Sequence, residues 1–411
     1  MEQIIFYTII GILIFDYCLE QFLDYLNSTK RSSELPAALK GIYDDEKYKK
    51  SQDYDKVNHK FSILTSSFSL ILILGFLYYS GFAFVDQIAR TFTSNPILIA
   101  LIFFGIILFA SDILNMPFSI YGTFVIEQKF GFNKTTPKLF VFDKIKSWIL
   151  SAIIGGGILA LITWFYLKAG SYFWVYAWIA VSIFMLFMTM FYTSLIVPLF
   201  NKLKPLEEGE LKEEITKFCE KVDYNLENVY VIDGSKRSTK ANAYFSGLGK
   251  KKKIVLFDTL IEKLNKEEIT AVLAHEIGHY KKKHTLVSVI TSIIQMGITL
   301  FILSLFVGNP ILSKALGSDI PSFHLGLITF GFLYGPISTV IGIFMNIISR
   351  KNEYTADQYA SVNYKGIHLA DALKKLSVSN LSNLTPHPWY VFFHYSHPTL
   401  LQRLNFIRKF N

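Results

Sequence analysis

The chain has 411 residues, of which 51% are hydrophobic and only 18% are charged, and its mean hydropathy is +0.35. This composition argues against a set of soluble domains, and 37 Phe with 23 Tyr exclude a disordered chain. Two cysteines, Cys18 and Cys219, are too few for a disulfide framework. The net charge of +9 is compatible with nucleic-acid binding, but excess Lys and Arg is also typical of membrane proteins. We therefore expect an integral membrane protein with no nucleic-acid partner.

Seven apolar stretches are long enough to cross a bilayer, which takes about 20 residues per helix. They are Ile4–Leu23, Phe61–Val85, Pro96–Phe118, Ser147–Leu167, Tyr172–Phe200, Thr285–Val307 and Leu325–Ser349. The first stretch lacks the basic start and the cleavage site of a secretory signal, so we expect it to be retained as a span.

Basic residues alternate between successive loops, which predicts the orientation of the chain. The first, third and fifth loops are rich in Lys and Arg, whereas the second, fourth and sixth contain only Arg90, Lys168 and Lys314 respectively. Positive loops face the cytoplasm. The alternation therefore predicts an N-terminus outside and cytoplasmic odd-numbered loops, with the C-terminal tail also cytoplasmic.

Two longer polar segments, residues 201–284 and 350–411, fall on this cytoplasmic side. In the first, Glu207–Val222 predicts an amphipathic helix, and Val229–Ile232 and Lys253–Phe257 predict short strands. Residues 241–247 are a possible third strand. Asn265 with Glu268 forms a capping-box pattern that predicts a helix running through Lys283.

That last helix contains His275-Glu276-Ile277-Gly278-His279. Residues four apart share one helical face, so both imidazoles can reach one metal ion and Glu276 can act on a water there. The alternative is a surface helix with two unremarkable histidines. A catalytic zinc site normally has three protein ligands, which predicts a third one elsewhere in the chain.

Glu353 is the candidate for that third ligand. His279 precedes the sixth span and Glu353 follows the seventh, so a hairpin that crosses the bilayer twice returns both to the same face. Asp357 lies one helical turn beyond Glu353 and could accept a hydrogen bond from a ligating histidine. Its alternative is a solvated acid on an exposed helix.

The tail adds His397, followed by Pro398 and Arg403. A histidine near zinc could donate a hydrogen bond to an oxyanion, and an arginine could support it or bind a substrate carboxylate. A simple loop at a helix start is the competing interpretation. We assign no role to the other histidines, which have no comparable spacing: His59, His284, His324, His368, His387 and His394.

Five polar residues within or near the spans could face a cavity, a partner or the membrane interface. They are Asp16, Glu20, Asp112, Asn115 and Asn346.

Several motifs in order resemble one family over essentially the full length of the chain. They are Glu34-Leu35-Pro36, residues 48–52 with Tyr54, Asn115-Met116-Pro117-Phe118, residues 130–133, Asn242-Ala243-Tyr244-Phe245, the histidine motif at 275–279, residues 352–357, and residues 396–398 with Arg403. The chain resembles the type I CAAX prenyl endopeptidases, which are seven-span zinc metalloproteases.

The resemblance implies one Zn²⁺ per chain, held by His275, His279 and Glu353, with Glu276 as general base and acid. It implies that Asn242, His397 and Arg403 contact substrate or stabilise the transition state. It also implies an all-α membrane fold, a seven-helix barrel around an intramembrane chamber, capped by a mostly helical protease domain with a small β-sheet.

We therefore predict a membrane-embedded zinc endopeptidase whose peptide substrate binds as a strand along Asn242, Ala243, Tyr244 and Phe245. Its predicted parts are residues 1–200 with five spans, 201–284 with the protease domain, 285–349 with two spans, and 350–411, which completes the zinc site. The ending at residues 408–411 carries no retrieval signal. This ending and the compact chain favour a bacterial inner membrane. Because bacteria generally lack protein prenylation, that location argues against prenylated substrates.

Two other functions remain as alternatives. A membrane quality-control protease of the heat-shock type shares the zinc motif, although that type typically has about four spans. A seven-helix transporter or lipid-binding chamber with an inactive protease remnant is the other, and the retention of all five metal-site residues argues against it.

Overall fold

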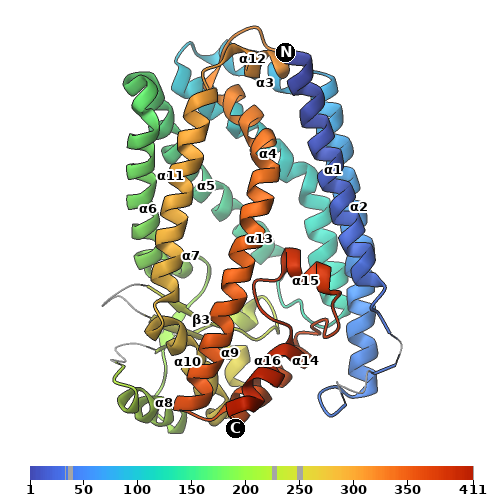
Figure 1. Ribbon diagram of the computed structural model, residues 1–411, viewed down its shortest axis with the longest axis vertical. Coiled ribbons are helices and arrows are strands. Elements are labelled where there is room, and N and C mark those ends of the chain that lie inside the picture. The colour runs from blue at the N-terminus through green and yellow to red at the C-terminus, as the bar shows by residue number, and fades with distance from the viewer. Residues whose placement is uncertain (33, 36–39, 225–228, 248–252, 411) are drawn as a thin grey trace.

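The computed structural model is an elongated bundle of helices with the N-terminus at one end and the C-terminus at the other (Figure 1). It describes the whole chain apart from residues 33, 36–39, 225–228, 248–252 and 411. Pro36 of the first-loop motif and the last residue of the chain therefore lie outside the described residues.

Long helices run along the bundle. They are α1 (Glu2–Ser28), α2 (Asp45–Tyr78), α4 (Pro96–Tyr121) with its π-helical continuation η2 (Gly122–Glu127), α5 (Pro137–Ala169), α6 (Phe173–Leu195), α11 (His284–Phe306) and α13 (Phe323–Asn363). Among the described residues, six helical stretches are long and apolar enough to cross a membrane. One of these, residues 137–200, is 64 residues long and contains both α5 and α6, joined by the 3-10 turn η3 (Gly170–Tyr172) and followed by α7 (Val197–Phe200). The count of six does not confirm the expected seven spans.

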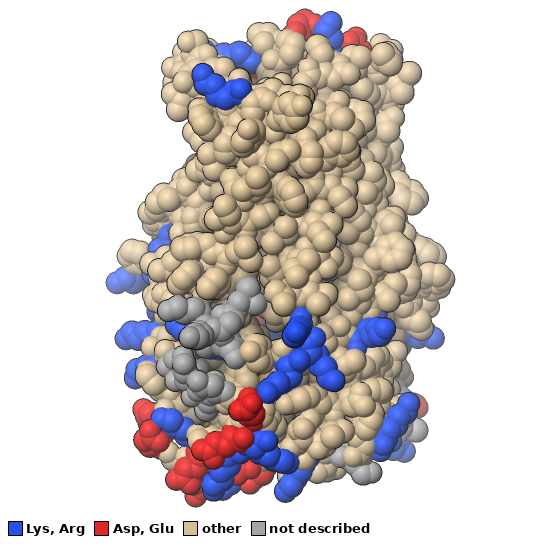
Figure 2. Space-filling model, turned by 60° about the vertical axis from the view of Figure 1, so that its left-hand side comes forward, with Lys and Arg blue, Asp and Glu red and all other residues tan. Residues whose placement is uncertain are grey.

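On the face that Figure 2 shows, a broad belt without charged side chains crosses the molecule between its two ends. Lys, Arg, Asp and Glu gather mainly at the lower end, and a few lie at the upper end. Large apolar side chains on the long helices are exposed there, including Phe15, Leu108, Ile153 and Phe344. Because apolar surface is tolerated where it faces lipid, this is the surface of a multi-pass membrane protein.

The second predicted span, Phe61–Val85, is wrong at its end. Helix α2 stops at Tyr78, and Ser80 adopts a left-handed conformation with φ of 52°. The chain then starts a separate amphipathic helix, α3 (Gly81–Phe92), which buries Phe82, Val85 and Asp86. The apolar run continued past the turn because α3 packs its apolar face into the bundle. The short α12 (Pro310–Ala315) lies beside α3 at the same end (Figure 1).

At the opposite end a four-stranded sheet has the order β1-β2-β4-β3. Strands β2 (Val229–Ile232) and β4 (Lys253–Phe257) are parallel, and β1 (Leu203–Pro205) and β3 (Ala243–Ser246) flank them antiparallel. The two strands predicted first occur with the bounds expected, and the possible third strand is confirmed within residues 241–247. No pattern in the sequence predicted β1, a three-residue strand that ends in proline.

Helices pack around this sheet and form the largest buried apolar cluster. They are α8 (Glu210–Lys221), α9 (Asp258–Ile261), α10 (Lys266–Lys281), α14 (Gly366–Ser379) and α16 (Leu400–Ile407), with the 3-10 turns η4 (Gly234–Lys236) and η6 (Arg408–Phe410). The short α15 (Pro388–His394) packs instead against α1 and α13. The predicted capping box is present. The Asn265 side chain accepts a hydrogen bond from the backbone N–H of Glu268, and the Glu268 carboxylate accepts one from the backbone N–H of Asn265. It starts α10 at the expected place.

Candidate metal centre

Helices α10 and α13 cross closely at Gly278. A Cβ at that position would lie 3.1 Å from the Cβ of Tyr359 and 3.2 Å from the backbone Cα and O of Ala356. Only a residue without a side chain fits such a distance to helical backbone without a shift. The glycine inside the histidine motif therefore allows α10 to lie directly against α13, the helix that carries Glu353.

Three potential metal ligands converge at this crossing. The Nε2 atoms of His275 and His279 are 3.1 Å apart. Glu353 Oε2 is 3.4 Å from Nε2 of His275, and Glu353 Oε1 is 3.2 Å from Nε2 of His279. Among the described residues, this is the one group of three such side chains whose ligand atoms all lie within 4.8 Å of one another.

These separations fit a zinc ion. With bonds of about 2.0 to 2.1 Å, ligand atoms at two corners of a tetrahedron are about 3.3 Å apart. Glu353 is 4% exposed, and its Oε2 has no hydrogen-bond partner among the described residues. A buried carboxylate oxygen without a donor is costly, and a cation coordinated there removes that cost.

Asp357 and Arg403 fix His275 on the side of its Nδ1 atom, away from the other two potential ligands. Asp357 is fully buried, and its Oδ1 is 2.9 Å from Nδ1 of His275. Arg403 on α16 donates to both carboxylate oxygens of Asp357, at 2.9 and 2.6 Å. Burial lowers the pKa of His275, but the neighbouring carboxylates of Asp357 and Glu353 outweigh that effect and raise the pKa to about 9. The carboxylate of Asp357 therefore fixes the ring of His275 with Nδ1 protonated and Nε2 facing the other two residues of this trio, His279 and Glu353.

The remaining predicted catalytic side chains lie beside the trio. Glu276 follows His275 on α10 and is half-buried. The His397 ring is exposed, and its Nε2 is 3.4 Å from Glu353 Oε1. The loop between α15 and α16 carries it, and Thr399 with Gln402 forms the capping box that starts α16.

Strand β3 lies at the edge of the sheet next to α10. It is paired through β4, and within the described residues no strand lies on its other side. The Phe245 ring packs against Tyr280 of α10, with the ring centroids 5.8 Å apart. Asn242 is exposed just before the strand. The predicted substrate strand is thus an edge strand beside the histidine helix.

His284, to which the sequence analysis gave no role, also lies at the centre. Its Nδ1 is 3.0 Å from Nδ1 of His279. The residue follows Lys283, which has a left-handed φ of 61°. Nothing in the run Lys281-Lys282-Lys283 marks a turn, because left-handed positions usually carry glycine or asparagine. The sequence therefore held no signal for this contact.

Three of the five polar residues noted in the spans, Asp112, Asn346 and Glu20, contact other helices. Asp112 accepts hydrogen bonds from Lys144 and Trp148 on α5, at 2.7 and 2.8 Å. Asn346 donates to the backbone of Phe393 at 2.7 Å. Glu20 lies 3.4 Å from His394, and Asn115 donates to the carbonyl of Ser111 on its own helix. The Oδ2 of Asp16 is 3.7 Å from the position that a Cβ on Gly335 would take.

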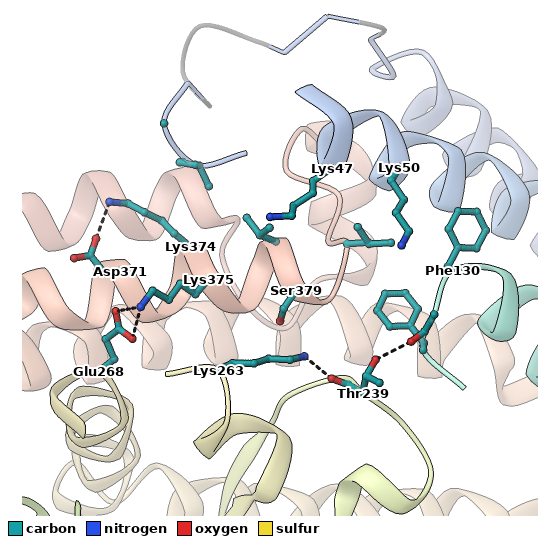
Figure 3. A pocket seen from close by; sticks show the side chains of 16 residues that line it. Lys47, Lys50, Phe130, Thr239, Lys263, Glu268, Asp371, Lys374, Lys375 and Ser379 are labelled. Carbon is teal, nitrogen blue, oxygen red and sulfur yellow. Dashed lines mark hydrogen bonds and ion pairs between the residues drawn. The ribbon is translucent and has the colours of Figure 1, made fainter. Parts of the chain in front are cut away.

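A separate cavity of about 850 Å³ opens between α2, α14 and the start of α10 (Figure 3). Five lysines line it, and three of them are paired with acids: Lys47 with Asp44, Lys374 with Asp371 and Lys375 with Glu268. None of the trio lines this cavity. It is therefore distinct from the metal centre.

Comparison with known families covers nearly the whole chain. Residues 24–202 match the family described as CAAX prenyl protease N-terminal, five membrane helices. Residues 205–411 match peptidase family M48.

Individual relatives align end to end. The chain is 36% identical to "CAAX prenyl protease 1 homolog" of Arabidopsis thaliana, over 97% of this chain and 96% of the relative. It is 37% identical to "CAAX prenyl protease 1" of Saccharomyces cerevisiae, over 96% and 93%. The crystal structure of S. mikatae Ste24p superposes with a TM-score of 0.93 at 34% identity and covers 98% of this chain and 99% of that one.

Both curated relatives are eukaryotic, so the expected bacterial inner membrane gains no support from them and stays a prediction. The family matches and the full-length identities together settle the class of protein: this chain belongs to peptidase family M48 with a CAAX prenyl protease N-terminal domain, and it is a multi-pass membrane zinc endopeptidase.

Proposed function

We propose that His275, His279 and Glu353 are the zinc ligands and that this centre hydrolyses peptide bonds. The convergence of the three side chains, with one Glu353 oxygen buried and without a donor, is the observation that carries the proposal. When bound, zinc supplies a Lewis acid that polarises the scissile carbonyl and makes a water nucleophilic at neutral pH.

Glu276 is the general base in this proposal. It is beside His275 but is not among the three converging ligands, so its carboxylate remains free to take the proton of the attacking water. The same carboxyl then passes the proton to the leaving amine. The Nε2 of His397 lies 3.4 Å from Glu353 Oε1, and in this proposal it donates to the oxyanion that forms on the substrate.

Asp357 and Arg403 act through His275. The bidentate bond from Arg403 keeps Asp357 charged and oriented inside the protein, and Asp357 in turn orients the histidine. Arg403 NH1 is 3.6 Å from Glu353 Oε2, so its charge also steadies the third ligand. These contacts favour a positioning role for Arg403 over direct contact with substrate.

The free edge of β3 suits an extended peptide. A substrate strand paired along Asn242, Ala243, Tyr244 and Phe245 would form main-chain hydrogen bonds next to the histidine helix. Such bonds set the register and leave the choice of side chains to other contacts.

For the substrate class, we propose the prenylated C-terminal peptide that gives the relatives their name. The test compares cleavage of two peptides of identical sequence, one prenylated on cysteine and one not, by purified enzyme and by Glu276→Gln enzyme. A large preference for the prenylated peptide supports the proposal. Equal cleavage of both by the active enzyme alone would favour the membrane quality-control function instead.

We propose seven spans around an intramembrane chamber. An odd number of crossings agrees with chain ends at opposite ends of the bundle, and the 64-residue stretch at 137–200 is long enough for two, as α5 and α6. Only 6% to 17% of the residues in the most apolar part of each candidate span are buried. A solid bundle would bury the inner faces of its helices, so the low values support a hollow interior.

In this proposal the protease end is cytoplasmic and the N-terminus is outside. The membrane and cytoplasmic parts of the chain meet at residues 200, 284 and 349. The boundary at 349 falls within α13, so one helix serves both the membrane part and the metal centre. In a variant lacking Cys18 and Cys219, single cysteines at the exposed Lys236 and Lys314 should label from opposite sides of the membrane. Labelling from one side would overturn the topology.

A further inference from the structure

The turn between α10 and α11 brings a third histidine against the metal centre. Helix α10 ends at Lys281, and Lys283 takes a left-handed conformation just before α11 begins at His284. The rings of His279 and His284 then meet edge to face, with centroids 5.0 Å apart and Nδ1 atoms 3.0 Å apart. The separation of the two Nδ1 atoms is that of a hydrogen bond between the rings.

The other nitrogen of His284 reaches the helix that carries Glu353. Its Nε2 is 3.1 Å from the hydroxyl of Thr355. That hydroxyl donates to the backbone carbonyl of Asn352 at 2.9 Å. A continuous chain of hydrogen bonds therefore joins the proposed ligand His279, through His284 and Thr355, to the backbone of α13.

The protons along this chain can be counted. A hydroxyl has one hydrogen and a neutral imidazole has one N–H. Because Thr355 gives its hydrogen to Asn352, it must accept from Nε2–H of His284. Nδ1 of His284 is then bare and accepts from Nδ1–H of His279. Nε2 of His279 is left with a free lone pair, 3.2 Å from Glu353 Oε1.

The reverse arrangement would prevent metal binding. If Thr355 donated to His284, then His284 would donate to His279, and the proton of His279 would occupy the Nε2 that faces the other two ligands. The bond from Thr355 to Asn352 selects the arrangement in which Nε2 is free.

We propose that His284 and Thr355 are positioning residues that fix the tautomer and ring orientation of His279. This inference rests on the proposed zinc site. The two ligating histidines are then held differently, His275 by the carboxylate of Asp357 and His279 by a neutral imidazole. A neutral partner adds no further negative charge, which preserves the electrophilic character of the metal ion.

The experiment uses purified full-length Thr355→Val and Thr355→Ser enzymes. Valine keeps the shape of threonine but cannot accept the proton of His284, whereas serine retains the hydroxyl. Thr355→Val should bind zinc about 10- to 100-fold more weakly in chelator competition, and Thr355→Ser should recover most of the affinity. The absorption spectrum of the cobalt-loaded protein should change in the valine variant and return in the serine variant.

Thr339→Val is the matched control. Thr339 is on the same helix and also donates to a carbonyl of its own helix, but it is far along α13 from Glu353. It should leave zinc affinity and the cobalt spectrum unchanged.

A double-mutant cycle with His284→Ala tests the chain as a unit. The effects of His284→Ala and Thr355→Val on zinc affinity should not add, because each substitution breaks the same chain of hydrogen bonds. Additive effects, or a Thr355→Val enzyme with ordinary affinity, would overturn the inference. Glu353→Ala separates the two levels of the argument. If it retains tight zinc, the proposed ligand set fails; if it loses zinc while Thr355→Val does not, only the roles of His284 and Thr355 fail.

Discussion

The two ends of the molecule each contain a buried aspartate bonded to a histidine and an arginine. At the protease end these are Asp357, His275 and Arg403. At the far end the His324 Nε2 is 2.7 Å from Asp86, and Arg90 donates to the same carboxylate at 2.9 Å. Both aspartates are almost fully buried.

The two clusters differ in what surrounds the histidine ring apart from its aspartate partner. Nε2 of His275 faces His279 and Glu353. The His324 ring lies against Phe103, with ring centroids 4.5 Å apart, while Arg90 continues to the hydroxyl of Ser322. The described residues around His324 supply no group of three metal ligands.

A histidine fixed by a carboxylate is therefore not enough to make a metal centre. At the far end the same three residue types join α3 to the start of α13 as a structural clamp. At the protease end the close crossing at Gly278 brings two more potential metal ligands, His279 and Glu353, against His275. The distinction lies in helix packing and not in residue type.

The largest expected effect is the loss of the third ligand. Glu353→Ala should abolish both zinc binding and peptide cleavage, because two histidines and water hold zinc much less tightly than three protein ligands do. Metal quantification and cleavage assays measure this. The far-end variant Asp86→Ala is the control: it should lose stability while retaining stoichiometric zinc. Zinc loss in both variants would erase the distinction between the two clusters.

Glu276→Gln should retain zinc and lose cleavage by at least about 100-fold, because glutamine cannot take the water's proton. Glu267→Gln, an acid in the first turn of the same helix, is the matched control and should keep full activity. Peptide cleavage at equal zinc content decides the matter. An active Glu276→Gln enzyme would remove the general base from the mechanism.

His397→Ala should reduce turnover by about 100-fold, which is the lower range for loss of one donor to an oxyanion. Because the ring is exposed, zinc content and melting temperature should hardly change. Steady-state kinetics should show the loss in kcat more than in KM. Ordinary turnover would return this residue to a loop at a helix start.

Asp357→Asn and Asp86→Asn make the same chemical change in the two clusters. Each should cost on the order of 1 to 3 kcal/mol of stability, because a buried donor loses its charged acceptor. Only Asp357→Asn should weaken zinc binding, by roughly 10- to 100-fold. Chelator competition and thermal unfolding separate the two effects. Equal loss of zinc in both variants would contradict the assignment of the far cluster as structural.

Zinc loading should depend on pH through His275. Its pKa of about 9 means that zinc must displace a proton at any lower pH, so the apparent affinity should fall by up to about tenfold per pH unit below 9. For the metal-free protein we expect the opposite trend: its stability should fall as the pH rises. The raised pKa stabilises it fully below about pH 6.5, and that stability is lost as the pH rises through 9. Melting curves with and without zinc from pH 6 to 9 test both trends.

Much of this arrangement could be predicted from the sequence. Spacing on one helix identified His275 and His279, and the hairpin of two spans led to Glu353 without any structural information. Strands β2 and β4 followed from short apolar runs. These features depend on local periodicity or on the membrane as a fixed reference.

Other features depend on contacts that no local pattern encodes. The left-handed Lys283 occurs in a run of three lysines, so the placement of His284 was not predictable. The end of α2 at Tyr78 was missed because α3 continues the apolar pattern after Ser80. Arg403 lies 46 residues from Asp357, and only the packing of α16 on α13 brings them together.

The order of the site residues along the chain bears on biosynthesis. Helix α10 supplies the two histidines, α13 supplies Glu353 only after two more crossings of the membrane, and α16 supplies Arg403 close to the end of the chain. A nascent chain that has emerged only as far as α11 therefore carries two of the three proposed zinc ligands. With the proposed ligand set, a chain that still lacks α13 cannot form the zinc centre, so we expect it to be unable to cleave itself or its neighbours during synthesis.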